Sequence, residues 1–395
     1  MGDPSELIAT AETSLAAIGR EAWGACVAGT SRECSGRAAN PFLSYDFLEA
    51  LESSGCATAK TGWLGQHIAV RSPAGDVLAV MPCYLKSHSF GEYVFDHAWA
   101  DAFERAGGRY YPKLLVAVPF TPVAGPRLLV RAGVDRKAAE AALASAAVQL
   151  TDRIGASSLH LTFLPEAEWS HLGELGFLRR TAKQFHWQNR GYQTFDDFLS
   201  ALASRKRKAI RKERARAVED GIDIEWLTGS DLTEAHWDAF YRFYVDTGSR
   251  KWGHPYLNRR FFSAVCERMA DDILLVMAKR NRRWIAGALN FVGATTLFGR
   301  YWGAIEHHDF LHFELCFYQA IDYAIANGLE TVEAGAGGSH KLSRGYMPMT
   351  TYSAHYIAHK GLRRAIADYL DDERHYVELE QEELSEHAPY RHEGG

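Results

Sequence analysis

The two halves of the chain share one order of elements, and this order limits the folds open to it. Each half is expected to run helix, β-hairpin, strand, helix, glycine and strand, with Gly155 and Gly328 as the equivalent glycines. The stretch IGASSLHLTF from Ile154 matches ANGLETVEAG from Ala326 in kind. The first copy is the longer one, and its surplus falls within residues 87–126.

We interpret this repetition as two copies of one α/β unit, the first with an inserted cap at about residues 87–126. The predicted fold class is α/β (α+β), with mixed central sheets flanked by helices. The expected domains are residues 1–190 and residues 191–395, the second with a basic helix at about residues 195–219 and a C-terminal helical tail. A chain of 395 residues is also long enough that two domains are the default.

Composition is that of a soluble globular protein, with 47% hydrophobic and 24% charged residues. A net charge of −5 argues against general coating of nucleic acid but leaves a local basic patch open. The six cysteines form no CxxC pair and no metal-ligand spacing, so we expect free thiols in a reducing, cytoplasmic compartment and no bound metal. The N-terminus lacks a signal-peptide pattern, and no stretch approaches the ~20 apolar residues of a membrane span.

A helix predicted over Leu311–Asn327 carries a carboxylate within its apolar arc. On a 3.6-residue wheel, Glu314 falls between Ile321 and Ile325. Burial of a lone carboxylate is costly, so Glu314 needs a partner or a raised pKa, and a raised pKa would make it a usable general base. The structural alternative is a buried pair with an Arg or Lys.

A glycine-rich loop follows the next predicted strand, Glu330–Glu333. It contains His340, Lys341 and Arg344 within five residues. A strand that delivers several ionisable side chains into such a loop is a common layout for a binding or catalytic edge, and a solvated hairpin loop is the alternative. These three residues are the expected source of a partner for Glu314.

The inserted segment, residues 87–126, mixes aromatic and ionisable residues among prolines. This mixture suits a small-ligand pocket, and an irregular cap whose aromatics simply pack is the alternative. His88 and His97 have no HxH or HxxxH partner pattern, so we do not expect them to hold a metal. The ligand-binding residues expected here are His88, Glu92, Asp96, Tyr110, Tyr111 and Lys113.

A strongly basic run forms part of the predicted helix at 195–219. Eight of the twelve residues from Arg205 to Arg216 are basic, and only Glu213 is acidic. This density favours a phosphate-binding surface over a merely solvated helix. The residues expected to contact phosphate or tRNA are Arg205, Arg207, Lys208, Arg211 and Lys212.

Several long phrases resemble one family. The second half, with FDDFLSAL before the basic helix, ILLVMAKRNRRWIAGALNFV, FGRYWG, LHFELCFYQAIDYAIANGL and EAGAGGSHKLSRGY, resembles the tandem FemAB-type acyltransferase fold of the GNAT superfamily. The phrases KSHSFGEYVFDHAWADAF, GGRYYPKL and VPFTPVAGPRLL narrow this to the FemAB-like peptidoglycan biosynthesis/recognition family of N-acyltransferases. The resemblance runs from about Pro41 to His359 and implies two tandem GNAT-like domains.

The resemblance implies an N-acyltransferase in which an amine attacks an activated acyl carbonyl directly. Such a reaction needs a base, donors for the oxyanion and an acid for the leaving group. Glu314, Glu333 and His340 are base candidates, Lys341 and Arg344 can hold a phosphate or the oxyanion, and Tyr301 or Tyr346 can serve as the acid. The expected catalytic residues are Glu314, Glu333, His340 and Lys341, and further expected substrate-binding residues are Arg127, Arg300, Tyr301, Tyr318 and Arg344.

The loop before Leu311 bears on the donor. GNAT enzymes that use acetyl-CoA have a glycine-rich loop here whose amides hold pyrophosphate, whereas this chain reads GAIEHHDFLHF, with Glu306 and Asp309. The departure favours aminoacyl-tRNA over acyl-CoA as co-substrate, and no resident cofactor is expected. The acceptor is expected to be an amine on a small molecule or peptide. The alternative function is a non-catalytic binding module of the same fold that recognises a peptide or cell-wall precursor.

Overall fold

The structure is a computed structural model that describes residues 7–30, 37–251 and 255–391. Its internal contacts divide the chain into two units, which are residues 1–33, 42–182 and 350–379, and residues 34–41, 183–349 and 380–395. This division differs from a single boundary near residue 190, because residues 350–379 return to the first unit. Among the helices of the described residues, none combines the length and the apolar character that crossing a bilayer requires.

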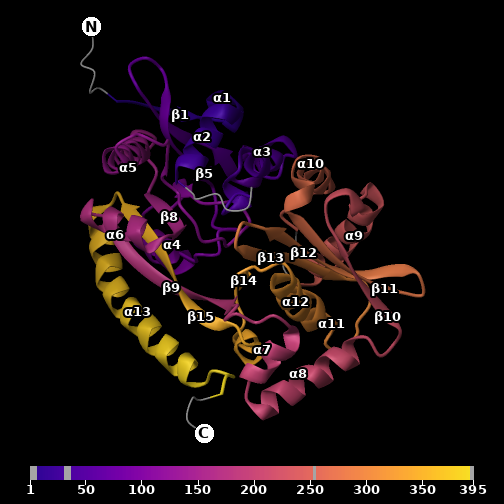
Figure 1. The fold of residues 1–395 in the computed structure, drawn as a ribbon. Helices are drawn as coiled ribbons and strands as arrows, with labels where there is room; N and C mark the ends of the chain where they lie inside the picture. Colours follow the sequence, from indigo (N-terminus) through magenta and orange to yellow (C-terminus); the bar gives the residue numbers. More distant parts are fainter. Residues whose placement is uncertain (1–6, 31–36, 252–254, 392–395) are drawn as a thin grey trace. The chain divides into compact units, whose positions relative to one another are not determined.

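The first unit holds two sheets (Figure 1). Its strands are β1 (Ile8–Glu12), β2 (Trp63–Gly65), β3 (His67–Arg71), β4 (Val77–Met81), β5 (Cys83–Lys86), β6 (Lys113–Val116), β7 (Leu129–Val130), β8 (Ser158–Leu164) and the later part of β15 (Met347–Ile357). Its helices are α1 (Leu15–Ile18), α2 (Arg20–Thr30), α3 (Tyr45–Ser53), α4 (His97–Arg105), α5 (Arg136–Arg153), α6 (Glu166–Glu174) and most of α13 (Lys360–Glu386). β9 (Leu178–Gln188) begins here.

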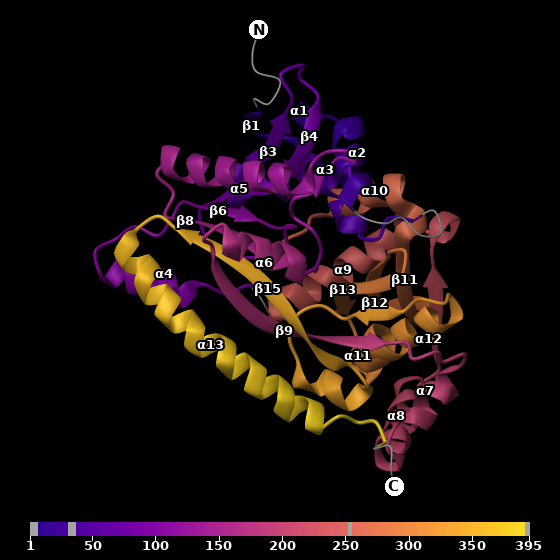
Figure 2. The ribbon, with the colours of Figure 1, turned by 60° about the vertical axis from the view of Figure 1, so that its left-hand side comes forward.

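Proline decides how the strands of the first unit are shared between its sheets. The composition of Val77–Lys86 predicts one strand, but the run divides at Pro82, which has no N–H to donate to a ladder. β4 then pairs with β3 and β7 in the order β1-β3-β4-β7, while β5 pairs with β2 and β6 in the order β15-β8-β6-β5-β2. Both ribbon views show α5 lying along the β1–β3–β4 sheet (Figures 1 and 2), where Leu143 and Leu150 join Ile68 in the core.

The second unit is built on one sheet in the order β10-β11-β12-β13-β14-β9. Its elements are α7 (Phe195–Ala201), α8 (Ser204–Ala217), β10 (Ile222–Leu227), α9 (Glu234–Lys251), α10 (Arg259–Met269), β11 (Ile273–Arg280), β12 (Arg283–Val292), β13 (Thr296–Ala304), α11 (Leu311–Phe313), a π-helical turn (Glu314–Tyr318), α12 (Gln319–Ala326), β14 (Thr331–Glu333) and a 3₁₀ turn (Ser339–Arg344). The helix predicted over 195–219 is therefore two helices, α7 and α8.

Helices cover both faces of this sheet, which explains its continuous apolar strands. Leu274 and Val276 of β11 share a core cluster with Ile321 of α12. Met277, of the opposite parity along β11, lies with Phe240 of α9 around Gly287, where an added Cβ would clash with both side chains. The stripe of aromatic residues in α9 is therefore core, as its spacing predicts.

The predicted repeat is confirmed in the topology of the two units. β6 and β8 are parallel and joined through α5, and β13 and β14 are parallel and joined through α11 and α12. Gly155 and Gly328 follow these crossovers with φ of 66° and 65°, a conformation that glycine adopts without strain. In the first unit, residues 87–112 are inserted between the paired strands β5 and β6, so the extra segment is shorter than the expected 87–126.

Candidate functional site

A cavity of about 400 Å³ lies in the second unit, where α8, the π-helical turn and the 3₁₀ turn meet. This volume is within the range of small-ligand sites, about 300–1,000 Å³. The lining residues are Arg205, Lys206, Ala209, Ile210, Glu213, Tyr318, Ser343 and Arg344. Three of them, Arg205, Tyr318 and Arg344, were predicted from the sequence as binding residues.

The cavity has a cationic side and a carboxylate on its wall. Neither Arg205 nor Lys206 forms an ion pair with any residue that the structure describes. Glu213 accepts hydrogen bonds from Arg344 Nη2 at 3.0 and 2.9 Å and from the Tyr318 hydroxyl. Burial, together with this bond to Glu213, raises the pKa of Tyr318, which keeps its proton at neutral pH. The site can therefore bind an anion beside a neutral phenol and an ion pair.

Glu314 is buried next to this cavity but takes its partner from α8. Arg214 donates to both Glu314 carboxylate oxygens, at 2.9 and 3.1 Å, and to Asp322 at 2.7 Å. The expectation that His340, Lys341 or Arg344 would supply this partner is wrong. Burial, opposed by Arg214, raises the pKa of Glu314 as the apolar arc predicts. Glu314 opens the π-helical turn, a feature often found at functional sites.

The remaining residues predicted as catalytic lie in the glycine-rich loop and beside it. Lys341 is buried, and its Nζ donates to the backbone carbonyls of Ala334, Gly335 and Ala336 at 2.9, 2.9 and 3.3 Å. Burial lowers the pKa of Lys341 to about 8. Glu333 accepts a bond of 2.9 Å from Arg300, with both side chains buried.

The other predicted residues of this unit pack against aromatic rings. His340 is exposed, and its ring packs against the rings of Phe313 and Phe317. Tyr301 is buried edge-on against Tyr244. None of Glu314, Glu333, His340 and Lys341 is among the residues that line the cavity.

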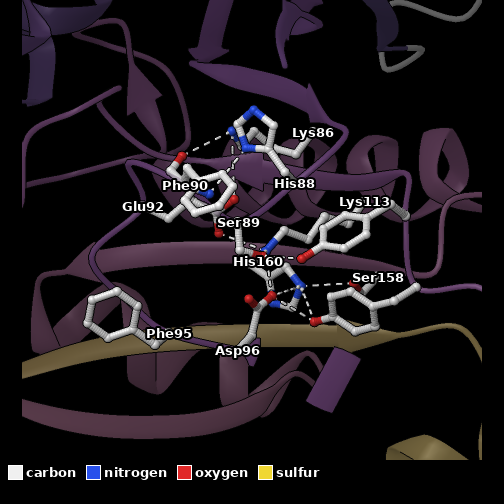
Figure 3. A network of polar contacts seen from close by, with 12 residues as sticks. Lys86, His88, Ser89, Phe90, Glu92, Phe95, Asp96, Lys113, Ser158 and His160 are labelled. Atoms are coloured by element: carbon white, nitrogen blue, oxygen red, sulfur yellow. Dashed lines mark hydrogen bonds and ion pairs between the residues drawn. The ribbon is translucent and has the colours of Figure 1, made fainter. Parts of the chain in front are cut away.

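In the first unit, the predicted ligand-binding residues form a buried polar network (Figure 3). Lys113 Nζ donates to Glu92 at 2.7 Å, to Ser89 at 2.7 Å and to Asp96. The Tyr110 hydroxyl donates to Asp96 at 2.7 Å. These ionisable groups are bonded to one another, so the segment resembles the packed cap more than the expected ligand pocket.

Burial and charge together shift the acidities in this network. Burial raises the pKa of Glu92 to about 7 and lowers that of Lys86, which lies 3.8 Å from Glu92, to about 7. Although burial opposes it, the Lys113 ammonium holds the pKa of Asp96 well below its usual range. Burial lowers the pKa of His160 to about 3, so this imidazole is neutral.

Three further predicted residues sit at the edge of the network or outside it. His88 Nε2 contacts the Thr61 carbonyl oxygen at 3.1 Å, and the Tyr111 hydroxyl contacts Ser89 at 2.8 Å. Arg127 is fully buried and donates to backbone carbonyls, with a 2.6 Å bond to Val123. All three side chains are therefore bonded to other groups of the protein.

Sequence reasoning missed residues whose importance depends on the fold. Glu213 was visible as the only acid in the basic run, and this was the available signal for the cavity wall. Nothing in the sequence marks Arg214 among its basic neighbours as the partner of Glu314. His355 also had no local signal, because its 2.7 Å contact with His160 Nδ1 joins positions far apart in the chain.

The topology defines the class of protein, a mixed α/β protein in which two units repeat one parallel strand–helix–strand crossover. A model of the FemAB-like family, described as "Peptidogalycan biosysnthesis/recognition", matches residues 14–392. The chain belongs to this family.

Solved structures agree with this fold. The crystal structure of FemX is 14% identical, with 88% of this chain and 98% of that chain covered and a TM-score of 0.52. The C-terminal domain of a putative lysylphosphatidylglycerol synthetase from Agrobacterium fabrum is 10% identical, with 89% and 96% covered and a TM-score of 0.52. At these identities the likeness shows the fold. No curated protein matched the chain.

Proposed function

We propose that this protein is an N-acyltransferase that transfers an acyl or aminoacyl group from an activated donor to an amine acceptor. The observation that carries the proposal is the cavity of about 400 Å³ lined by Arg205 and Lys206, which form no ion pair within the described part of the chain, beside Tyr318 and the Glu213–Arg344 pair. A donor that carries phosphate would bind its anionic part to these cations. Membership of the FemAB-like family supports the reaction class.

The turn before α11 supports aminoacyl-tRNA over acyl-CoA as the donor. Hydrogen bonds from His308, and then from Arg280 and Arg283, hold the pKa of Glu306 at about 2, so this carboxylate stays ionised. Asp309, which lies in the same turn as Glu306, is 3.8 Å from Arg216 of α8. Both carboxylates are paired with cations, so the difference from a pyrophosphate-binding turn lies in the sequence GAIEHHDFLHF, which lacks the glycine-rich run whose amides would hold a pyrophosphate. A tRNA donor would place the activity in the cytoplasm.

The transfer forms a bond between the amine nitrogen and the acyl carbon and breaks the bond from that carbon to the donor oxygen or sulfur. The amine proton passes to the leaving atom. Tyr318 and Glu213 offer a hydrogen-bonded donor and acceptor in the cavity wall for that proton, and Arg344 offers charge for the oxyanion. Glu314 is a weaker candidate for the base, because Arg214 and Gln319 already donate to its oxygens.

The test is a mass-shift assay with charged tRNA or acyl-CoA and a panel of lysine-containing peptides. The double variant R205A/K206A is expected to lower kcat/KM by about tenfold or more, since each charge-assisted bond contributes about 1.5–3 kcal/mol. The matched control is K360A/R364A, which removes two exposed cations of α13 that neither line the cavity nor belong to the basic run. An equal loss in the control would show that net charge, not the cavity, binds the donor.

The second candidate is a binding module for a peptide or cell-wall precursor. It is favoured by the internal engagement of Glu314, Glu333 and Lys341, each of which is bonded to protein groups. Under this function, neither donor is consumed with any acceptor, while the acceptor alone raises the thermal midpoint. Turnover with either donor would exclude it.

A further inference from the structure

The segment that follows α13 lies beside the elements that supply cations to the cavity. After α13 ends at Glu386, residues 387–391 run past α7 to the start of α8, and both ribbon views show this yellow segment next to these two helices (Figures 1 and 2). We call residues 387–391 the strap. The strap belongs to the second unit, as do α7, α8 and the 3₁₀ turn, so all of these contacts lie within the unit that holds the cavity.

Backbone hydrogen bonds join the strap to the junction between α7 and α8. Ala203 N donates to the Pro389 carbonyl oxygen at 2.9 Å. Arg391 N donates to the Ala201 carbonyl oxygen at 3.0 Å, and an antiparallel bridge lies between these two bonds. Ala203 is the N-cap of α8. The strap is therefore bonded to the residue from which α8 starts.

This end of α8 has little local support of its own. The side chain of its N-cap, Ala203, has no oxygen that could accept from the first backbone N–H groups of the helix. The first turn carries Arg205 and Lys206, whose positive charges oppose the helix macrodipole. We therefore expect the position of these two cations to depend on the strap.

Tyr390 links the strap to the 3₁₀ turn, the second element that supplies a cation. Its hydroxyl donates to the Gly345 carbonyl oxygen at 2.8 Å, and Gly345 ends that turn directly after Arg344. Burial raises the pKa of Tyr390, so the hydroxyl keeps the proton that it donates. The Arg190 guanidinium carbon lies 4.2 Å from the centroid of the Tyr390 ring, a cation–π contact that holds the ring in place.

The strap thus contacts both cation-bearing elements without lining the cavity itself. Arg205 and Lys206 come from α8 and Arg344 from the turn, while no strap residue is among the described residues that line the cavity. Arg344 is bonded to Glu213, which lies about two helical turns beyond Lys206. This bond joins the turn to the middle of α8, and Tyr390 joins the turn to the start of α8.

We propose that Tyr390 is a positioning residue, which sets the distance between Arg344 and the two cations of α8 for an anion that bridges them. Such an anion needs donors from both elements at a fixed separation, and a preformed arrangement lowers the entropy that is lost on binding. The inference rests on the proposed function, because the anion is the phosphate of the donor. Loss of the Tyr390 hydroxyl should therefore weaken anion binding and leave the chemical step unchanged.

The test is calorimetric titration of the full chain with inorganic pyrophosphate as the probe anion. Y390F removes the bond to Gly345 but keeps the ring and the backbone bonds, so it should weaken pyrophosphate binding about threefold to tenfold. The matched control is Y369F, which removes a 3.1 Å bond from a tyrosine hydroxyl to Glu373 within α13 and should bind as the wild type does. In the transfer assay, Y390F should raise KM for the donor by the same factor, with kcat changed less than about twofold.

Hydrogen exchange of the free protein measures the role of the strap without any ligand. In Y390A, the amides of Arg207 and Gly345 should exchange at least about threefold faster than in the wild type. These amides are bonded to the carbonyls of Ala203 and Leu342, each at 3.0 Å, and they report on the start of α8 and on the end of the turn. The amides of α10 should keep their wild-type rates, which shows that the variant has folded.

The possible failures of this inference and of the proposed function differ. If the wild type binds pyrophosphate and Y390F binds it equally well, the positioning role is overturned and the proposed function stands. Equal weakening in Y390F and Y369F, a fall in kcat at unchanged KM, or unchanged exchange of both amides in Y390A has the same consequence. If the wild type gives no heat with pyrophosphate, the anion-binding cavity of the proposed function is overturned, and this inference with it.

Discussion

Removal of Arg214 should destabilise the protein much more than neutralisation of its partner Glu314. Glu314 is only 3% exposed, and burial raises its pKa despite two hydrogen bonds from Arg214. In the variant R214M the carboxylate has lost its cation and stays protonated in the folded state. In E314Q, Arg214 keeps its 2.7 Å bond to Asp322, so no buried charge is left unpaired.

The size of the R214M effect follows from proton linkage. The ordinary pKa of a Glu carboxyl is 4.5, and burial raises the pKa of Glu314 above this value in the wild type. In R214M the pKa of Glu314 is higher still, because Arg214 no longer opposes the effect of burial. Above pH 4.5 the folded protein therefore binds more protons than the unfolded chain. Stability is therefore lost as pH rises from 4.5. At about 1.36 kcal/mol per unit, the loss that Glu314 contributes at pH 7 is at most about 3.4 kcal/mol, and the loss of the bond to Asp322 adds to it. E314Q should stay within about 1 kcal/mol of wild type.

Urea denaturation at pH 5 and pH 7 measures the free energy of unfolding of R214M and of E314Q. The R214M penalty should shrink to below about 1 kcal/mol at pH 5, and E314Q/R214M should recover most of the loss at pH 7. The reasoning would be refuted by a penalty for R214M that is the same at both pH values. A double variant no more stable than R214M would refute it as well.

Variants at three other positions test separate parts of the structure by denaturation. Burial raises the pKa of Glu92 to about 7, so the contribution of Glu92 to stability should fall between pH 4.5 and 7, and E92Q should remove up to about 1.4 kcal/mol per unit of this slope. The Ser44 hydroxyl accepts from Phe47 N at 3.2 Å, so S44A should cost about 1 kcal/mol while S44D retains the cap. In G303A the new Cβ would lie 2.2 Å from the Phe243 carbonyl carbon, so destabilisation of at least about 1–3 kcal/mol is expected, and a neutral result would contradict the packing of α9 on β13.

The sequence predicted helices and strands best where a clear apolar period or a capping residue marked them. The apolar spacing predicts a helix over Arg259–Met269 and the alternation predicts a strand over Ser158–Leu164, and α10 and β8 have these bounds. Ser44 is a residue type that favours an N-cap, and it caps α3. Strand β1 was missed because Ile8–Glu12 has weak periodicity and gains its stability from pairing with β3, which no local pattern shows.

Helix α6, Glu166–Glu174, was missed for a related reason. No element is predicted for residues 165–172, although Glu166 and Glu168 in the first turn suit the start of a helix. Long elements with a clear pattern could therefore be placed in order from the sequence, whereas short elements such as β1 and α6 depend on tertiary packing.

The candidate site could be predicted only in part, because composition counts charges without showing which are already paired. Of the cations in the basic run, Arg211, Arg214 and Arg216 are bonded to nearby carboxylates. Arg205 and Lys206 have no such partner among the described residues, and they lie in the first turn of α8, which contains no acidic residue.

Cations in the first turn of a helix oppose its macrodipole, which disfavours them by about 0.3–1 kcal/mol each at an exposed position. An anion bound in the cavity would relieve both this opposition and the repulsion between Arg205 and Lys206. The end of α8 that is least stable in isolation is therefore the end best suited to hold the phosphate of a donor.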